Sequence, residues 1–341
     1  MYKIAIAGAS TLLGKELKEA LSESPLAAAN FVLLDDEEAE GQLDRVGDEV
    51  TFVQAIAAGA FEHADFTFFC GTEQQTRAHW INALRAGSSV LDMTGALDGE
   101  SGVLVRAPWL GAQAVTVDLL TAAVVPADPA ALTLALLLER MSQAAPVRLA
   151  AATVLLPASG FGRAAVDELH QQTVNLLSFQ GLPRETFDAQ VAFNLLGGLG
   201  EAAQVSLGSA GARIRRHYAA LSAGKLPALS LQVVHTPVFH GLTFSVLVEL
   251  ERPVDLAVLE EVLSGDRMDL VLEDTDSPSN LAAMGQNDVL VRLRPEPGDR
   301  NPALVSRVWI WAACDNLRLH AQNAVDCALD LGRLRPQGTV Q

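Results

Sequence analysis

The N-terminal segment places the strongest constraint on the fold of this chain. An apolar strand, Lys3–Ala7, leads directly into the loop Gly8-Ala-Ser-Thr-Leu-Leu-Gly14. The next residues predict a helix, because Leu13, Leu17 and Leu21 recur every four positions with charged residues between them. A strand joined to a helix by a glycine loop is typical of the first turn of a Rossmann-type domain.

Strands and helices continue to alternate along the first third of the chain. We expect strands at Phe31–Leu34, Val50–Val53, Phe66–Cys70 and Val90–Met93, with a helix at Gln74–Ala86 before the last of them. Strands that alternate with helices form parallel sheets with crossover connections. The first region is therefore predicted to be an α/β domain with a doubly wound parallel sheet.

The pattern changes after about residue 145. Long strands are expected at Val147–Leu156, Leu229–Val238 and Thr243–Leu250, around one long helix, Arg163–Leu177. Further elements are expected at Met268–Leu272, Val289–Leu293, Leu304–Ala312 (strands) and Leu317–Leu331 (a final helix). This region predicts an α+β domain with a mixed or antiparallel sheet and helices on one face.

Composition excludes several classes of partner. The 341 residues carry 41 acidic and 24 basic side chains, a net charge of -17, and phosphate binding needs a basic face, so we expect no nucleic acid and no membrane partner. Apolar runs such as Ala130–Leu138 are too short to span a bilayer, and the N-terminus does not resemble a signal peptide. Cys70, Cys314 and Cys327 are odd in number and scattered, which argues against a disulfide framework. We expect a cytoplasmic protein.

The glycine loop has two interpretations. Gly8 and Gly14 could bring backbone amides against a dinucleotide diphosphate at the helix N-terminus, or they could form a tight turn that binds nothing. Thr11 occupies the position of the middle glycine, where a side chain would narrow the approach of a diphosphate. The candidate cofactor-binding residues are Gly8, Ser10, Thr11, Leu12, Gly14, Asp35, Cys70 and Gly71.

The second strand ends in an acidic run, Asp35-Asp36-Glu37-Glu38. One carboxylate at such a strand end can hold the ribose hydroxyls of NAD, whereas four would repel the additional phosphate of NADP. A solvated acidic loop is the alternative interpretation. Any dinucleotide that binds is therefore expected to be NAD rather than NADP.

A second helix start lies at Asp128 and Pro129, which precede the apolar run Ala130–Met141. Aspartate suits the N-cap and proline suits the first helical position. A cysteine in this first turn would have its thiolate stabilised by the helix dipole, but the chain has Ala131 and another alanine there. The setting typical of a thiolate enzyme is present without the thiolate.

Several segments, taken in order, resemble the aspartate-semialdehyde dehydrogenase family. They are Gly8–Gly14, Asp92–Asp98, Val125–Thr133, Ser159–Gly162, Thr236–Phe239, Asp315–Arg318 and Asn323–Val325. Two segments, Pro157–Arg163 and Ala192–Leu196, look most like the Usg-type branch of dehydrogenase-like homologues. The resemblance implies a dinucleotide-binding domain over residues 1–127 and 316–341, a catalytic and dimerisation-type domain over residues 128–315, and a homodimer formed through the sheet of that second domain.

The resemblance also assigns five site positions. In the family a cysteine attacks the aldehyde, hydride passes to NADP, and phosphate releases the acyl group; the cysteine of Asn-Pro-Asn-Cys-Ser-Thr falls on Ala131. The substrate-orienting glutamine falls on Leu156. The carboxylate-binding arginine and the acid/base histidine fall on His235 and Leu242, and the phosphate-binding arginine falls on Asp98. A methyl group forms no covalent intermediate and leucine transfers no proton. We therefore assign no catalytic residue and expect no semialdehyde reaction.

Other side chains could supply chemistry, but each has a structural alternative. Cys70 ends a parallel strand, where open sheets place ligands, yet free cysteine is usually a small core residue. His235 and His240 could handle protons, although hydrogen-bonded or surface histidines are more common. The segment Arg213–His217 could bind an anion or form a solvated helix face. The histidines lack the spacing of metal ligands, so no metal site is expected.

Two functions follow from these observations. The first is a pseudoenzyme, a homodimer that acts by binding a protein or a small metabolite. The second is an NAD-dependent oxidoreductase that acts on another carbonyl substrate without a covalent thioester. A relationship to the acetylglutamyl-phosphate reductases is a third alternative, and the same missing thiolate at Ala131 counts against it.

Overall fold

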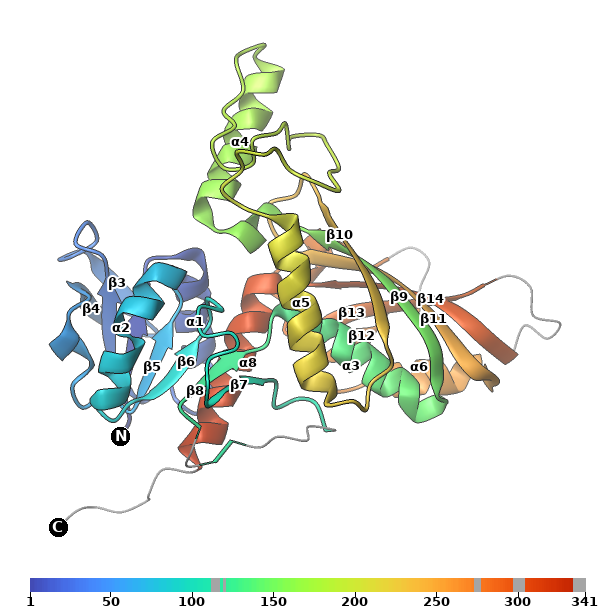
Figure 1. Cartoon of the computed structure of the whole chain (residues 1–341), viewed down its shortest axis with the longest axis horizontal. Helices are drawn as coiled ribbons and strands as arrows, with labels where there is room; N and C mark the ends of the chain where they lie inside the picture. Colours follow the sequence, from blue (N-terminus) through green and yellow to red (C-terminus); the bar gives the residue numbers. More distant parts are fainter. Residues whose placement is uncertain (112–116, 119–120, 273–276, 297–303, 334–341) are drawn as a thin grey trace. The chain divides into compact units, whose positions relative to one another are not determined.

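The computed structural model describes residues 1–111, 117–118, 121–272, 277–296 and 304–333 (Figure 1). The chain divides into two compact units: residues 1–127 with 320–341 form unit 1, and residues 128–319 form unit 2. Each unit contains one large sheet. Within the described ranges, no helix is both long enough and apolar enough to cross a membrane.

Unit 1 contains an eight-stranded sheet in the order β3-β4-β2-β1-β5-β6-β8-β7. The strands are β1 (Lys3–Ala7), β2 (Asn30–Asp35), β3 (Leu43–Val46), β4 (Glu49–Ala55), β5 (Phe66–Phe69), β6 (Ser89–Asp92), β7 (Val103–Arg106) and β8 (Ala123–Pro126). Neighbouring strands run parallel, except that β3 and β4 form an antiparallel pair. The predicted parallel sheet is confirmed.

Both faces of this sheet are covered by helices. The covering elements are α1 (Leu12–Ser22), α2 (Glu73–Arg85), the 3₁₀ turn η1 (Ala58–Phe61) and α8 (Asn316–Gly332). Alternate side chains of a strand point to opposite faces. Ile4 and Ile6 accordingly belong to the core that includes residues of α1 and α8, while Ala5 and Ala7 belong to the core that includes residues of η1 and α2. This is the doubly wound arrangement expected from the alternating pattern.

Unit 2 contains a six-stranded mixed sheet in the order β10-β9-β11-β14-β13-β12. The strands are β9 (Val147–Leu156), β10 (Leu229–His235), β11 (Leu242–Asp255), β12 (Met268–Leu270), β13 (Val289–Pro295) and β14 (Leu304–Cys314). The pairs β10–β9 and β12–β13 are parallel and the other three are antiparallel. The predicted mixed sheet is confirmed.

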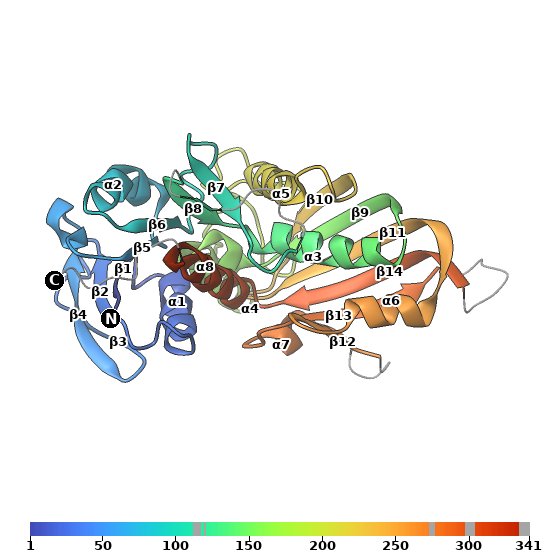
Figure 2. The same ribbon diagram turned by 90° about the horizontal axis from the view of Figure 1, so that it is seen from below.

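Helices of unit 2 pack against this sheet and against one another (Figure 2). They are α3 (Pro129–Ala144), α5 (Leu207–Ser222) and α6 (Leu256–Leu263); a short helix, α7 (Asn280–Ala283), lies beside β14. The expectation of a single helix between β9 and β10 is wrong, because α5 follows α4 (Arg163–Leu177). Glycines and arginines lie among the apolar residues of α5, which makes its apolar period harder to recognise in the sequence.

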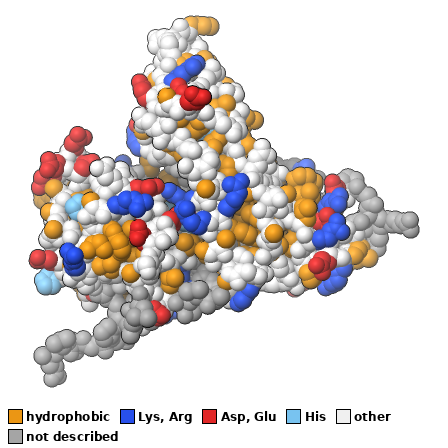
Figure 3. All heavy atoms as spheres, in the orientation of Figure 1, with side chains coloured by type: hydrophobic (Ala, Val, Ile, Leu, Met, Phe, Trp, Pro, Cys, Tyr) orange, Lys and Arg blue, Asp and Glu red, His pale blue; other side chains and the backbone are white. Residues whose placement is uncertain are grey.

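Helix α4 and the loop that follows it stand away from the sheet of unit 2 (Figure 1). The 3₁₀ turn η2 (Ala158–Phe161) precedes α4, and a small core around Leu169 and Phe187 joins the helix to the loop. Hydrophobic side chains are exposed on this projection (Figure 3), among them Leu177, which is 71% exposed, and Phe179, which is 99% exposed.

Candidate functional site

The start of α3 is built as the sequence predicts. The Asp128 carboxylate caps the helix and accepts hydrogen bonds from the backbone N–H groups of Ala130 (2.9 Å) and Ala131 (3.3 Å). The backbone N–H of Asp128 donates to Nδ1 of His217 on α5 (2.8 Å). The Ala131 side chain, at the position that the resemblance gives to the nucleophile, is completely buried. Hydrogen bonds from both α3 and α5 therefore fix the first turn of α3, and the side chain at the nucleophile position in this turn is the methyl group of Ala131.

The prediction of a solvated face for Arg213–His217 is wrong at His217. Arg215 and Arg216 are exposed, but His217 is buried beside Ile214 and Tyr218 on the inner face of α5. Residues three or four positions apart share one face of a helix, so the run of basic residues spans both faces. His217 supports the α3 start and is not an anion ligand on a surface.

Three more of the five positions lie at one end of the unit 2 sheet. Leu156 ends β9 directly opposite His235, which ends β10. Leu242 begins β11 opposite Cys314, the last residue of β14. The Cys314 Sγ lies 3.7 Å from Oγ1 of Thr133 on α3, which brings the first turns of α3 beside these strand ends. The fold thus gathers Ala131, Leu156, His235 and Leu242 in one region of unit 2.

His235 is the unusual member of this group. Its side chain is completely buried, and its ring lies 4.8 Å from that of Phe187 and 6.0 Å from that of Phe161 (centroid distances). Neither ring nitrogen makes a hydrogen bond within the described part of the chain. Burial lowers the pKa of His235 to about 4; the nearby Leu156 carbonyl opposes this shift, but the Thr236 N–H and hydroxyl already donate to that oxygen. His235 is therefore a neutral imidazole in an apolar setting. It lacks the positive charge with which an arginine at this position could bind a carboxylate.

Asp98, the fifth position, belongs to unit 1 and follows β6. The turn around it is held by the buried Asp92 carboxylate, which accepts hydrogen bonds from the backbone N–H groups of Thr94 and Leu97. Burial raises the pKa of Asp92, the hydrogen bonds oppose this, and the negative charge of Asp98 adds to the rise. Two neighbouring carboxyl groups make the turn unfavourable for an anion such as phosphate.

All three cysteines of the chain lie in the described residues, and each is buried and free. Burial is the main cause that raises the pKa of Cys70 and of Cys314 to about 12, and it raises the pKa of Cys327 well above its usual value. Their thiols are therefore protonated and poor nucleophiles near neutral pH. The Cys70 thiol donates to the Ala7 carbonyl oxygen (3.3 Å), which favours its structural interpretation. Among the described residues, no three His, Cys, Asp or Glu side chains are grouped to hold a metal ion.

The predicted cofactor residues lie together around the end of β1. Gly8 adopts a φ of +91°, and Thr11 caps α1, which begins at the half-buried Leu12. The remaining close contacts in this group join Ser10 to Asp35, Thr11 to Cys70, Gly14 to the Thr11 hydroxyl and Gly8 to Gly71. The clustering expected of a Rossmann-type loop is present, and the contacts are made within the chain.

Asn316 is a structural residue whose role sequence reasoning missed. Its side-chain oxygen accepts hydrogen bonds from the Ser159 hydroxyl (3.2 Å) and from the backbone N–H of Gly241 (3.0 Å). It thereby links the turn after β9 to the start of β11, near Leu156 and Leu242. Asn316 lies in Asp315–Arg318, one of the segments that resemble the family, but only the fold reveals its partners.

Comparisons with known proteins agree with this architecture. Residues 3–125 match the family profile of the semialdehyde dehydrogenase NAD binding domain, and residues 138–319 match that of the semialdehyde dehydrogenase dimerisation domain. A USG-1 protein homolog of Pseudomonas aeruginosa is 30% identical over 94% of this chain and 95% of its own length. Another USG-1 protein homolog, from Azotobacter vinelandii, is 29% identical over 95% of this chain and 96% of its own. The solved structure of a probable aspartate-semialdehyde dehydrogenase from Pseudomonas aeruginosa superimposes with a TM-score of 0.84 at 28% identity, covering 97% of this chain and 98% of that one.

Proposed function

This chain belongs to the semialdehyde dehydrogenase family, in its Usg-type branch, and we propose that it is a pseudoenzyme that acts by binding. In this proposal the dehydrogenase fold is retained as a homodimeric scaffold for a protein or a small metabolite. The semialdehyde reaction is absent, because the chain has no group that can form the thioester.

One observation carries the proposal. The residue at the capped start of α3 is Ala131, and the three thiols elsewhere in the chain are buried with raised pKa values. No cysteine is therefore poised to attack an aldehyde. Three further positions also lack the groups that the reaction needs. The buried side chains of Leu156, His235 and Leu242 offer neither a carboxylate-binding cation nor a catalytic proton at neutral pH.

An enzyme assay tests the proposal directly. We expect no oxidation of aspartate semialdehyde by the wild-type protein with NAD or NADP and phosphate, and none by Ala131→Cys, because the other four positions stay unchanged. The five-fold variant Ala131→Cys, Leu156→Gln, His235→Arg, Leu242→His, Asp98→Arg shows whether the scaffold still accepts the chemistry. Phosphate-dependent turnover by the wild type would refute the pseudoenzyme.

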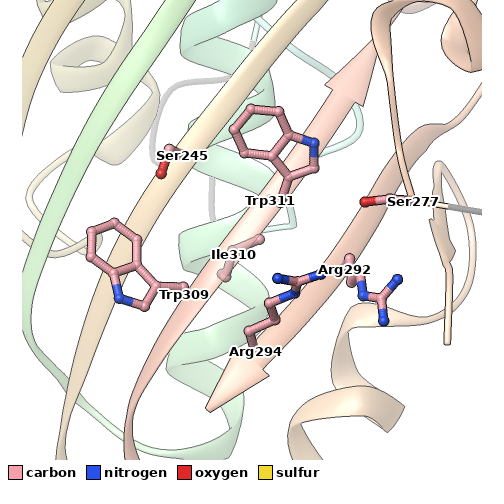
Figure 4. A pocket seen from close by; sticks show the side chains of 7 residues that line it. All are labelled: Ser245, Ser277, Arg292, Arg294, Trp309, Ile310 and Trp311. Carbon is pink, nitrogen blue, oxygen red and sulfur yellow. The ribbon is translucent and has the colours of Figure 1, made fainter. Parts of the chain in front are cut away.

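The homodimer is assigned to the open face of the unit 2 sheet. On β11 the side chains of Phe244 and Val246 are buried, whereas Ser245 and Leu247 alternate onto the other face and are only half-buried. On that face Trp309 and Trp311 of β14 stand directly opposite arginines of β13. Figure 4 shows Trp309, Trp311, Arg292 and Arg294 lining a pocket on this face. The volume of the pocket is about 240 Å³. Aromatic and arginine side chains are enriched at protein interfaces, and this face lies within the dimerisation domain match.

A charge substitution on this face should separate the copies. The Trp309 side chain is 41% exposed, and the variant Trp309→Glu would place a carboxylate at this position against the facing copy. We therefore expect the mass measured by light scattering to fall from that of a dimer to that of a monomer. Leu177→Glu makes a similar change on α4 and should leave the dimer intact. A dimer that survives Trp309→Glu but is lost in Leu177→Glu would move the interface to α4, and a monomeric wild type would remove it.

A second candidate function is an NAD-dependent oxidoreductase acting on another carbonyl. The observation in its favour is Asp35, a carboxylate at the end of β2 beside the glycine loop, as in dinucleotide-binding domains. The exposed Asp36, Glu37 and Glu38 that follow favour NAD over NADP. This alternative requires that the loop accept a dinucleotide.

A further inference from the structure

The loop between β1 and α1 is closed by its own side chains. The Thr11 hydroxyl is within donor distance of two carbonyl oxygens, that of Gly8 (2.8 Å) and that of Cys70 (2.9 Å). The same hydroxyl accepts a hydrogen bond from the Gly14 N–H (3.0 Å). One side chain thus joins the end of β1, the end of β5 and the N-terminus of α1. In a dinucleotide-binding loop this position is a glycine, because the diphosphate must approach the backbone closely.

The carboxylate that would hold the ribose is also engaged within the chain. One oxygen of Asp35 accepts hydrogen bonds from the backbone N–H of Ser10 (2.8 Å) and from its hydroxyl, and the other accepts from the Asp36 N–H (3.0 Å). Asp35 is only 4% exposed. Three of the roughly four acceptor sites of this buried carboxylate are thus occupied within the chain, which leaves little of it open to a ribose hydroxyl.

The two retained glycines are explained without a cofactor. A Cβ on Gly8 would lie 2.2 Å from the Gly71 nitrogen, and a Cβ on Gly14 would lie 2.2 Å from the Gly8 carbonyl oxygen. Both positions are too close to backbone for any side chain. The glycines therefore let the chain approach itself, and they do not by themselves indicate a bound diphosphate.

We infer that Ser10, Thr11 and Asp35 have converted the family's dinucleotide loop into a closed structural turn that does not take up NAD or NADP. The residues present do not fit the cofactor that the NAD binding domain match implies. The contacts of the diphosphate and of the ribose are replaced by the Thr11 and Ser10 side chains. The inference goes beyond the missing catalytic groups, since a protein without them could still bind a dinucleotide.

Reopening the loop tests this inference as a gain of binding. Calorimetric titration of the full-length wild type with NAD and with NADP should give no binding heat at millimolar concentrations. The double variant Ser10→Ala, Thr11→Gly removes the hydroxyl that occupies Asp35 and the Thr11 side chain, and glycine is tolerated at a helix N-cap. We expect it to bind NAD with a Kd at least tenfold below the highest concentration at which the wild type gives no heat, and to bind NADP less well because of the acidic run after β2.

Thr72→Gly is the matched control, because Thr72 caps α2 in the same unit in the way that Thr11 caps α1. It should lower the melting temperature without creating dinucleotide binding. If the double variant does not fold, Ser10→Ala alone keeps the helix cap and removes the hydroxyl contact to Asp35, while the contact from the backbone N–H of residue 10 remains. Clear NAD binding by the wild type, or a folded double variant that binds no better, would overturn the inference. Neither result decides against the proposed pseudoenzyme, which fails if the wild type turns over a substrate, whereas NAD binding by the wild type would favour the oxidoreductase named as the second candidate.

Discussion

His235→Leu is expected to stabilise the protein by about 1–2 kcal/mol near pH 7, because it removes a buried polar ring that has no hydrogen bond. Leucine is apolar and similar in size, and the ring site is bordered by Phe161 and Phe187. The free energy of unfolding from urea denaturation measures the gain. A loss of stability in this variant would show that the imidazole has a favourable partner.

The free energy of unfolding of the same variant should also depend less on pH in the acid range than that of the wild type. The unfolded chain protonates His235 near pH 6.5, whereas burial holds the folded pKa at about 4, so the unfolded state binds the extra proton between these values. Stability that is fully present above about pH 6.5 is therefore lost as the pH falls, by up to about 3 kcal/mol at pH 4. Other groups titrate in this range too, so the informative quantity is the difference between wild type and variant at each pH. His170→Leu, an exposed position on α4, should reproduce the wild-type pH dependence.

Gln172→Leu is expected to release the loop that covers α4. The completely buried Gln172 amide donates to the carbonyl oxygens of Pro183 (2.7 Å) and Ala189 (2.9 Å) and accepts from the N–H groups of Val191 (2.8 Å) and Ala192 (3.2 Å). Each buried backbone group left without a partner costs about 1–3 kcal/mol, so the loop should open locally. We expect hydrogen exchange at Val191 and Ala192 to accelerate by a factor on the order of 100 or more.

Two further variants separate this effect from a general loss of helix stability. Gln171→Leu changes the exposed neighbour and should leave the protection of the loop unchanged. Gln172→Glu keeps the acceptors for Val191 and Ala192 but removes the donors, so its exchange rates should be intermediate. Wild-type protection at Val191 and Ala192 in Gln172→Leu would show that packing around Phe187, rather than this amide, holds the loop.

Local rules were sufficient for much of the fold. The apolar run Lys3–Ala7 and its glycine loop predicted the first strand and turn of unit 1, because strand, turn and helix signals adjoin one another there. Asp128 and Pro129 predicted the start of α3 for the same reason, since cap chemistry involves only neighbouring residues. The mixed sheet of unit 2 followed from long strands without regular crossover helices between them.

Features that depend on distant partners could not be predicted. The sequence does not reveal that His217 faces Asp128, because that contact joins residues 89 positions apart. The orphaned state of His235 depends on β10 pairing with β9 and on the position of Phe187. The closed state of the glycine loop likewise requires Thr11 to meet Cys70, 59 residues away. Sequence patterns located these positions, and tertiary packing determines what they do.

We propose that the chain keeps the dehydrogenase architecture without a thiolate that could perform the chemistry. A single-turnover experiment can decide this, with wild-type protein in molar excess over aspartate semialdehyde, in the presence of NAD or NADP and phosphate. The absorbance of reduced nicotinamide and the intact protein mass report hydride transfer and acyl-enzyme formation together. We predict no reduced nicotinamide and an unchanged protein mass. Formation of one equivalent of reduced nicotinamide per aldehyde, or of a covalent acyl adduct, would contradict the account.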